Sequence, residues 1–448
     1  MDKRYAVEGA PSISGSTVTT SLRTIPFAPG GKSTSTVTVR LCTSADCTTV
    51  YPGSTATFTV NLDVRLKDWA TFQRDPGHTG YVAVAYKTAD FTNAWSTPGG
   101  SSPAYRQVAA RRGNIFLNLR NASGRLLTRG LNAATGATVW EYDLGQKNYF
   151  SGPTYANGRV ISAAMDLSSG NIPMDVIDAE KGTYLRSLSY ASQFATAGTP
   201  TPIGDDLFHA AGYFGNEVYG YDAAAGTRSW VQQSLGFPSQ IGVVQEGESV
   251  AADANLVYYF SAGRLFTLSR LSGAVVNSIS NPFFSSAGLS YFGTYQGGPI
   301  LAGSGRVITF SDNRQSSQPQ PLVAFSTTNN AVIWRTAASY VGDPALRDGK
   351  LYAIKANSAI VDIIDVTDGS VTASINLGAD KGTLAGNVIA TSSHLFVAGA
   401  AGTYAIDLQQ STYPIVWSAP QGGLLSITPD NLLIVGSVTG ALNAYRLY

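Results

Sequence analysis

Short apolar runs alternate with polar turns along most of the chain. Runs such as LVYYF at 256–260 and LFVAG at 395–399 have the length of strands that are buried on both faces of a sheet. Each of them follows a shorter strand and a turn that contains Asn, Asp, Gly or Ser. Together with 47 Gly among 448 residues, this pattern predicts an all-β protein with many tight turns.

A strand, a tight turn and a second strand recur as one unit along the chain. The clearest copy is LNAATGATVWEYDL at 131–144, and further copies follow at a period of roughly 45 residues. Gly or Asn at the turn suits a backbone position with positive φ. A recurring unit of this length that contains paired strands indicates a protein built from repeated structural units. The turn residues are Gly136, Gly182, Gly226, Gly273, Asn330, Gly369 and Tyr413, of which Tyr413 departs from the pattern.

Tryptophan recurs at a fixed place in these units, four residues after the turn. Three copies carry Arg186, Asn277 or Ala373 there instead. We interpret the indole as a packing device that fills the wedge between adjacent sheets, because a set of separate active sites at one repeated offset is a poorer explanation. The predicted blade-docking residues are Trp95, Trp140, Trp230, Trp334 and Trp417.

The two ends of this repeat region each contain part of an incomplete unit. Phe91–Trp95 resembles the second strand of such a motif without a first strand or turn before it, whereas Leu424–Tyr448 stops where that strand should follow. Seven complete units and one shared unit give eight. The sequence therefore predicts an eight-bladed β-propeller with four antiparallel strands per blade. Its last blade is closed by the N-terminal strand, because a closed ring avoids open sheet edges at its ends.

Residues 1–66 differ from the repeats in composition. Segments such as STVTTSLRTIPF and STSTVTVRLC alternate small polar and apolar residues, which is the period of half-buried strands. We predict a small β-sandwich, immunoglobulin-like (Ig-like) or an incomplete part of one, which acts as a spacer or adhesion-type module. The predicted domains are 1–66, the β-sandwich segment, and 67–448, the propeller.

Cys42 and Cys47 are the two cysteines of the chain. A disulfide across so short a loop is geometrically feasible, and two unpaired thiols are the alternative. Zinc is disfavoured because a second pair of ligands is missing from the motif. We expect the disulfide, which favours an oxidising compartment.

Two segments hold candidate contact residues. Asp75, His78 and Thr79 cluster in the lead-in to the repeats, which we interpret as a link that pins the N-terminal segment to the propeller. A long insertion at 281–299 belongs to a rim of the ring, where binding is usually placed. Its aromatic residues form a contact loop or pack down on the ring, and the sequence leaves both interpretations open. They are Phe283, Phe284, Tyr291, Phe292 and Tyr295.

The charge of the chain argues against one class of partner. Lys and Arg number 30, Asp and Glu number 29, and the basic residues are scattered, so nothing indicates binding to nucleic acid. No apolar stretch is long enough for a transmembrane helix. The first residues lack the apolar core of a signal peptide, so we expect a mature or truncated chain that is periplasmic, outer-membrane-associated or secreted.

The unit Ala/Tyr-x-Asp/Asn-x-x-x-Gly-x-x-x-Trp, as in LNAATGATVW and YGYDAAAGTRSW, resembles the quinoprotein-like (PQQ-like) β-propeller repeat. The lead-in DWATFQRDPGHTGYV resembles the opening of stand-alone bacterial propellers, which include the scaffold lipoprotein of the outer-membrane β-barrel assembly machinery. The resemblance covers residues 68–448. It implies that the Trp docks between blades. It also implies a non-enzymatic scaffold of the bacterial cell envelope that contacts protein, or polysaccharide, through loops on one rim.

The same resemblance implies an alternative, an oxidoreductase that depends on PQQ and calcium. In such enzymes the quinone lies over a central Trp, carboxylate and amide groups hold the calcium ion, and an Asp acts as base. Many also have a disulfide between adjacent cysteines, which this chain lacks. We therefore expect no catalytic, cofactor-binding or metal-binding residue. The carboxylates within the units sit where turn hydrogen bonds explain them; they are Asp178, Asp222, Asp365 and Asp407.

Other chemistries leave few candidates. His78, His209 and His394 are far apart in the sequence, and a lone His in a strand is more often a packed residue than a ligand. A sugar-active enzyme, the third hypothesis, needs two carboxylates collected at the ring centre. Asp205 and Asp206 form the nearest pair, and a corner between two strands explains them better.

Overall fold

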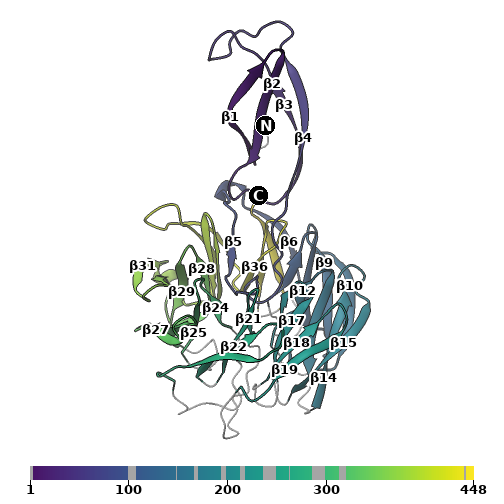
Figure 1. Ribbon diagram of the computed structural model, residues 1–448, viewed down its shortest axis with the longest axis vertical. Helices are drawn as coiled ribbons and strands as arrows, with labels where there is room; N and C mark the ends of the chain where they lie inside the picture. The colour runs from purple at the N-terminus through teal and green to yellow at the C-terminus, as the bar shows by residue number, and fades with distance from the viewer. Residues whose placement is uncertain are drawn as a thin grey trace.

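The protein is an all-β molecule, as predicted. The computed structural model describes residues 4–98, 107–147, 149–165, 170–192, 198–211, 217–235, 249–261, 263–284, 298–311, 319–437 and 440–448. Besides strands, this part of the chain has the short 3-10 helices η1 (Thr88–Asp90) and η2 (Ala379–Lys381). Neither has the length and apolarity needed to cross a bilayer. Figure 1 shows a slender N-terminal extension above a wide body of small sheets.

The strands of the extension and of the segment that leads into the body come first in the chain. They are β1 (Tyr5–Ser14), β2 (Thr17–Thr24), β3 (Gly31–Val39), β4 (Ala56–Val64), β5 (Tyr81–Val82) and β6 (Thr92–Thr97).

The strands of the body follow in groups. The first groups are β7 (Ala109–Arg111), β8 (Asn114–Arg120), β9 (Leu126–Asn132) and β10 (Thr138–Gly145); β11 (Tyr149–Phe150), β12 (Thr154–Ala156), β13 (Arg159–Met165), β14 (Gly170–Asp178) and β15 (Tyr184–Ser192); β16 (Thr201–Ile203), β17 (Asp206–Ala211), β18 (Glu217–Asp222) and β19 (Thr227–Gln232); and β20 (Ala251–Ala252), β21 (Leu256–Ser261), β22 (Arg264–Ser269) and β23 (Val275–Ser280). The later groups are β24 (Ile300–Leu301), β25 (Arg306–Phe310), β26 (Leu322–Ser326) and β27 (Ala331–Arg335); β28 (Tyr340–Arg347), β29 (Lys350–Lys355), β30 (Ile360–Asp365) and β31 (Val371–Asn376); β32 (Leu384–Thr391), β33 (His394–Gly399), β34 (Gly402–Asp407) and β35 (Ile415–Ala419); and β36 (Leu424–Ile427), β37 (Leu432–Gly436) and β38 (Leu442–Arg446).

Within each group, strands that are neighbours in the sequence pair antiparallel. We call each set of four strands a unit, so that β7–β10 form one unit and β12–β15 the next, with the short β11 added to β13. The units β28–β31 and β32–β35 are joined by a parallel bridge between Asp343 and Asn387, and β5 pairs in parallel with β32. The meander within each unit agrees with the predicted strand, turn and strand pattern.

The units stand around a common centre that their first strands line. β12 contacts both β7 and β16, β16 contacts β20, β20 contacts β24, and β32 contacts both β28 and β36. One backbone hydrogen bond recurs from unit to unit, between the end of the third strand and the turn after the first strand. The amide of Ala133 donates to Gly113 at 2.9 Å, and the amide of Leu447 donates to Asn431 at 2.9 Å. Because the first strands line the centre, the fourth strands, at the far edge of each sheet, form the outside of the body.

Burial follows from this arrangement. The second strands β21 (LVYYFS) and β33 (HLFVAG) are buried along almost their whole length, because neighbouring units cover both of their faces. The fourth strand β23 (VVNSIS) is exposed or half-buried at every position except Ile279. Burial of one large apolar side chain stabilises the fold by about 1.5–3 kcal/mol, so the contacts between units are the main source of stability.

Four of the predicted indoles reach from their own sheet to the turn of the next unit. Each ring nitrogen Nε1 donates to a backbone carbonyl there: Trp95 to Ala133 (2.8 Å), Trp140 to Ala179 (3.2 Å), Trp230 to Arg270 (2.9 Å) and Trp334 to Val366 (3.0 Å). The turn glycine lies against the indole face. A Cβ at Gly136 would come within 2.5 Å of the Trp95 ring, so this position has no room for a side chain.

Other pairs of residues fill the seams that lack Trp. Arg186 donates to a carbonyl in the turn of the following unit. The side chain of Asn277 donates to that of Asn330, the turn residue of its neighbour. Ala373 leaves space that Tyr413 fills, since both belong to one apolar cluster. This packing gives a reason for a Tyr with φ of 49° at a turn where the other units have Gly or Asn.

The strand β6 completes the last unit. It pairs antiparallel with β38, with Leu442 opposite Thr97 and Ala444 opposite Trp95. The fifth predicted indole, Trp417, lies at this junction, edge-on to Tyr445 with 5.0 Å between ring centroids. A strand from the start of the repeat region thus closes the sheet formed by the end of the chain, as the sequence predicts.

The N-terminal extension differs from the predicted sandwich. β1 pairs with β2 and β3 pairs with β4, and the two hairpins are separate two-stranded sheets. The predicted alternation is present, since β3 exposes every second residue over most of its length. Large apolar side chains nevertheless face solvent, among them Ile13 (65% exposed) and Phe58 (55% exposed). Two short hairpins bury too little apolar surface to form a core of their own, which is why the strands are found without a packed sandwich.

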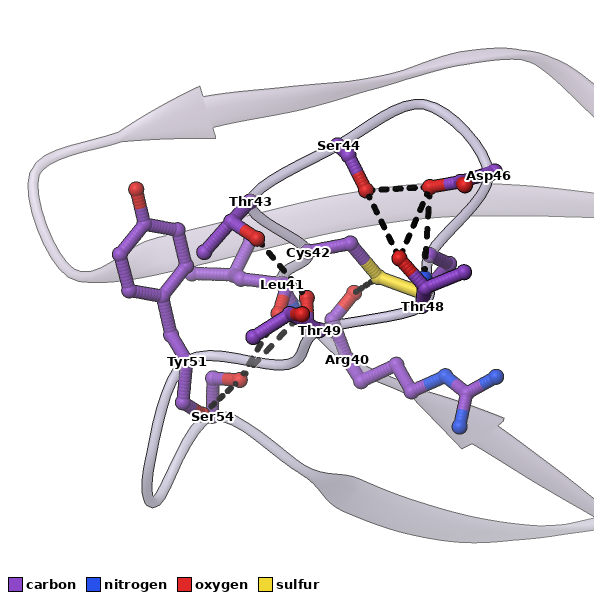
Figure 2. The surroundings of a disulfide bond; sticks show 11 residues. Arg40, Leu41, Cys42, Thr43, Ser44, Asp46, Thr48, Thr49, Tyr51 and Ser54 are labelled. Atoms are coloured by element: carbon purple, nitrogen blue, oxygen red, sulfur yellow. Dashed lines mark hydrogen bonds between the residues drawn. A yellow bond between two sulfur atoms is a disulfide. The ribbon is translucent and has the colours of Figure 1, made fainter.

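A disulfide joins Cys42 and Cys47 beyond the end of β3 (Figure 2). Their Cα atoms are 5.0 Å apart. The loop is further held by the Asp46 carboxylate, which accepts hydrogen bonds from Ser44 and Thr48. It lies at the end of the extension that is remote from the body (Figure 1). The disulfide therefore stiffens the tip of a hairpin and takes no part in the ring.

We expect Gly136→Ala to destabilise the protein more than Gly158→Ala. Both glycines have positive φ, 70° and 83°, but an added Cβ meets the Trp95 ring at the first position and nothing within 4 Å at the second. The backbone strain costs about 1–2 kcal/mol in both variants. Displacement of the indole adds about 1–3 kcal/mol in Gly136→Ala. Urea titration measures both free energies of unfolding, and equal values would show that the indole moves away without cost.

Candidate functional site

Residues 68–86 cross the centre of the body, and we call this segment the central strap. Its backbone bonds to the first strand of one unit after another at 2.7–2.9 Å: Trp69 to Ala110, Ala70 to Tyr155, Pro76 to Ala252, Gly77 to Leu301, Thr79 to Leu346 and Gly80 to Ala390. The hydroxyl of Thr71 adds a bond to the carbonyl of Pro200, next to β16, at 2.6 Å. The lead-in is thus more than a link, because it contacts the units from β7 to β32 in order.

The strap lies at one face of the body. Its partners sit where the first strands run into the turns that lead to the second strands, so we call this the turn face. The connections from second to third strands, and from one unit to the next, belong to the opposite face.

The predicted cluster of Asp75, His78 and Thr79 shapes the strap. The Asp75 Oδ1 atom accepts hydrogen bonds from the amides of Gly77 and Thr79, both at 3.1 Å, and Oδ2 accepts one from the Thr79 hydroxyl. His78 is fully buried and has a φ of 55°, and its Nδ1 lies 2.8 Å from the carbonyl of Pro299. Asp75 and Thr79 are therefore occupied in holding a tight turn.

Gln73 is the hub of the centre, and sequence reasoning missed it. Its Nε2 donates to the carbonyl of Pro344 at 2.9 Å, and its Oε1 accepts from Nδ2 of Asn387 at 2.8 Å and from Nε2 of Gln107 at 3.2 Å. Asn387 in turn exchanges two hydrogen bonds with the backbone of Leu425 in β36. All three amide side chains are buried. The network therefore joins the strap to units that are far apart in the sequence.

Asp343 is the carboxylate of this centre. It is buried, and burial raises its pKa to about 8. It lines a cavity of about 10 Å³, the size of a single water molecule. The cavity is also lined by Thr309, whose buried hydroxyl has no hydrogen-bond partner among the described residues. The rest of the lining is mostly apolar; it comprises Phe72, Gln73, Gly298, Ile300, Phe310, Leu322 and Pro344.

The three histidines are not brought together. Burial lowers the pKa of His78 to about 4 and that of His209 to about 3. The His209 ring packs edge-on against the Tyr190 ring, with the ring centroids 4.5 Å apart. His394 bonds to the hydroxyls of Ser393 and Thr88. Within the described ranges, no group of three or more His, Cys, Asp or Glu side chains is arranged to hold a metal ion.

The carboxylate pairs considered in the sequence have structural partners. Asp205 forms an ion pair with Arg159 at 2.8 Å, and Asp206 forms one with Arg270 at 2.8 Å. Asp178 and Asp222 accept hydrogen bonds from the amides of their own turns, as predicted. The pKa of Asp178 is lowered by these bonds, first of all by the one from the amide of Lys181. None of these carboxylates forms an acid and base pair at the ring centre.

The predicted contact loop is described in part. The Phe283 ring is 48% exposed and lies 5.2 Å from the guanidinium of Arg335. Phe284 lies against Gly263, where an added Cβ would meet its ring. Tyr291, Phe292 and Tyr295 lie outside the described residues. The first aromatic of the loop is thus a surface residue, and the second packs on the body.

A cleft of about 850 Å³ separates the extension from the turn face. It is lined by Lys32, Arg65, Leu66, Asp68, Arg111, Arg112, Tyr155 and Glu180. Arg112 forms an ion pair with Asp63 of the extension at 2.6 Å, and Arg111 forms one with Glu180 at 3.2 Å. Carboxylates match most of the cations here, so we read the cleft as the joint between extension and body.

The donors at the centre are a poor match for a quinone held by calcium. Calcium takes six to eight oxygen ligands, several of them carboxylates. Among the described residues that line the central cavity, Asp343 is the one carboxylate, and the neighbouring amide groups are bonded to one another. The guanidinium of Arg74 is buried and donates to the carbonyl of Tyr81. We therefore derive no reaction step through a cofactor at this end of the centre.

We expect Gln73→Leu to loosen the strap. The substitution leaves the buried amides of Asn387 and Gln107 each without one partner, and each unpaired group costs about 1–3 kcal/mol. Gln409→Leu, at an exposed turn, is the matched control. Urea titration measures the lost stability. Hydrogen exchange of the Tyr155 and Ala252 amides, which donate to the strap, shows whether it loosens. Exchange as slow as in the control would show that Gln73 does not hold the strap.

We expect stability to fall on both sides of mildly acidic pH. The folded pKa of Asp343 is raised to about 8 from 3.8, so the folded state binds more protons between these values and loses relative stability as pH rises through them. The folded pKa values of His78 and His209 are lowered from 6.5, so their contribution is lost as pH falls below 6.5. Each group contributes a slope of at most about 1.4 kcal/mol per pH unit.

The variant Asp343→Asn tests the predicted loss of stability as pH rises. The variant should gain thermal stability over the wild type as pH rises from 3.8 towards 8, and the difference between the two should level off below 3.8, where the carboxyl is protonated in both states. Melting temperatures across this pH range measure the difference. A constant difference at all pH values would mean that the carboxylate is neutralised by a partner in the folded state.

Comparison with known proteins agrees with the resemblance seen in the repeats. A family model described as outer membrane protein assembly factor BamB matches residues 122–375. A search of curated protein sequences gives no match. Among solved structures, BamB from Moraxella catarrhalis is similar, with a TM-score of 0.59 and 14% identity over 80% of this chain and 99% of that chain.

Two quinoprotein dehydrogenases are similar to the same degree. A europium-containing methanol dehydrogenase has a TM-score of 0.62 and 12% identity over 85% of this chain and 98% of that chain. Quinohemoprotein alcohol dehydrogenase ADHIIG from Pseudomonas putida HK5 has a TM-score of 0.58 and 12% identity over 85% of this chain and 80% of that chain. At these identities the likeness concerns the fold, which is the β-propeller. Because the matched residues make up more than half of the chain, the protein belongs to the family described as outer membrane protein assembly factor BamB.

Proposed function

We propose that this protein is a non-enzymatic scaffold of the bacterial cell envelope that binds a protein partner. The observation that carries the proposal is the central strap. The chain's own backbone occupies the turn-face end of the ring centre, and the amide side chains of Gln73 and Asn387 bond there to each other and to the backbone. A centre filled in this way serves the stability of the ring and leaves binding to its outer surfaces.

The organisation of the chain supports this proposal. We take the body, residues 67–448, as an eight-bladed propeller in which β6 and β36–β38 form the shared blade, and residues 1–66 as a separate module. Family membership favours the envelope as location and a protein over a polysaccharide as partner. The disulfide between Cys42 and Cys47 favours an oxidising compartment, which suits a periplasmic, outer-membrane-associated or secreted protein.

The alternative is an oxidoreductase that uses PQQ and calcium. The similarity to methanol and alcohol dehydrogenases supports this alternative, because these enzymes share the fold. The donors described near Asp343 weigh against it at the turn-face end of the centre. A sugar-active enzyme has less support, because Asp205 and Asp206 are each ion-paired with a different arginine.

Affinity capture and thermal unfolding distinguish these functions. The immobilised protein should retain one envelope protein from a detergent-solubilised extract in a stoichiometric, saturable complex that re-forms from the two purified components. PQQ with calcium should leave the melting temperature unchanged. A ligand of the native state at 100 times its dissociation constant adds about 2.7 kcal/mol, which is readily measured. A stabilisation of that kind would favour the oxidoreductase function over the scaffold function. Failure to reconstitute any complex would contradict the scaffold function.

A further inference from the structure

The outermost strands of the units are open sheet edges. In the sheets of the described residues, β10, β15, β19, β23, β27, β31, β35 and β6 each pair with a neighbour on one side. An open edge presents unpaired N–H and C=O groups, and proteins commonly blunt such edges with charged side chains. β10 carries Glu141 and Asp143, β15 carries Arg186, and β19 carries Arg228.

The edge of β23 is different in composition and exposure. Its sequence, VVNSIS, has no charge, and Val275 and Val276 are 45% and 60% exposed. Leu271, in the turn before it, is 85% exposed, and Phe283, just after it, is 48% exposed. The edge strands β6 (TNAWST), β31 (VTASIN) and β35 (IVWSA) are also uncharged, but among their residues Val371 is the one exposed large apolar side chain in the structure described. Exposed apolar side chains thus lie at both ends of the free edge of β23.

The backbone of β23 is available for pairing beyond a bulge. The register between β22 and β23 shifts at Val276, so this residue is the extra one, and pairing is regular from Asn277 to Ser280. The seam to β27 also lacks an indole, because Asn277 bonds to Asn330 where five of the units place a Trp. The free edge therefore combines a short regular stretch with outward apolar side chains.

Unpaired cations lie at one end of this edge. Arg264, at the start of β22, is exposed and donates to the hydroxyl of Ser278, and Arg335, at the end of β27, is exposed beside Phe283. Neither forms an ion pair with a carboxylate of the described residues. The described residues of the two units from 249 to 336 contain four Arg and a single carboxylate, that of Asp253. The surface is therefore apolar at the start of β23 and positive at the Phe283 end.

We propose that the edge of β23, from Leu271 to Phe283, docks an extended strand of the partner protein. The strand adds to the sheet β20–β23 through backbone hydrogen bonds, which is the mode of β-augmentation. Its side chains are apolar and uncharged where it passes Val275 and Val276, and acidic where it passes Arg264 and Arg335. This inference rests on the proposed function, since it names the surface of the scaffold and the chemistry of its partner.

Synthetic peptides test the edge without knowledge of the partner. The probe is a capped, fluorescently labelled peptide of alternating Val and Thr with two Asp at one end, made with the acids at either terminus. A peptide with Lys in place of Asp is the control probe. Fluorescence anisotropy is measured against the wild type, Val276→Lys, Arg335→Glu and Thr372→Lys. Thr372 occupies on β31 the place that Val276 occupies on β23, three residues after the turn glycine.

The wild type and Thr372→Lys should bind one of the acidic probes with equal dissociation constants. Val276→Lys should weaken that binding at least tenfold, and Arg335→Glu should weaken the acidic probe while improving the Lys probe. The proposal is overturned by equal binding to Val276→Lys and the wild type, by an equal loss in Thr372→Lys, or by no saturable binding up to about 1 mM. Melting temperatures of the variants exclude misfolding as the cause of a loss.

The capture experiment separates this inference from the proposed function. If the wild type retains an envelope protein and Val276→Lys retains as much of it, the scaffold stands and the β23 edge is not its docking site. If the acidic peptide binds with the expected pattern but no envelope complex re-forms, the edge is a strand-binding site and the scaffold function fails.

Discussion

Closure of the ring by β6 and β38 is the constraint on which the rest of the structure depends. Each unit is apolar on both faces of its sheet, so an open ring would leave the faces of its first and last units in water. The largest apolar cluster lies at this junction and combines residues from both ends of the body, such as Trp69 and Ile115 with Val435 and Leu447. The pairing of β6 with β38 therefore protects the core as well as the backbone edges.

The strap and the closing strand are parts of one segment. The strap ends just before η1 and β6, so the chain passes through the ring centre, bonds to one first strand after another and then reaches the outside of the last unit. Backbone bonds to the first strands β7, β12, β20, β24, β28 and β32 tie the spacing of these units to the length of the strap. The amide network around Gln73 adds cross-links between the strap and β28, β32 and β36. Shape and closure of the ring are therefore coupled through a peptide that is not itself part of the repeat.

How far the sequence predicts this structure depends on whether a feature is local. The turn glycines and the indoles four residues later recur at fixed offsets, so periodicity alone reveals them. The role of Phe91–Trp95 in completing the last unit follows from the same pattern, because this segment matches the second strand of the motif. The central network does not recur: Gln73 and Asn387 are separated by 314 positions, and neither differs in type from many surface residues. The alternation in residues 1–66 predicts strands correctly, but it says nothing of what covers them. A sandwich was expected there because half-buried strands usually face a second sheet, and here the hairpins remain separate.

The same fold serves dehydrogenases and scaffolds, so the difference in function must come from residues that depart from the repeat pattern. Where polar groups satisfy one another, as the side chains of Gln73, Asn387 and Gln107 do, little bonding capacity is left for a ligand, and their place in the centre is structural. On the outside, the repeat makes every fourth strand an edge of similar geometry. One edge becomes a specific surface when its sequence breaks the pattern. On β23 the indole is replaced by Asn277, the strand lacks charge, and Arg335 lies beside the exposed ring of Phe283. In a repeat protein the conserved geometry explains the fold, and the deviations from it are where function must be sought.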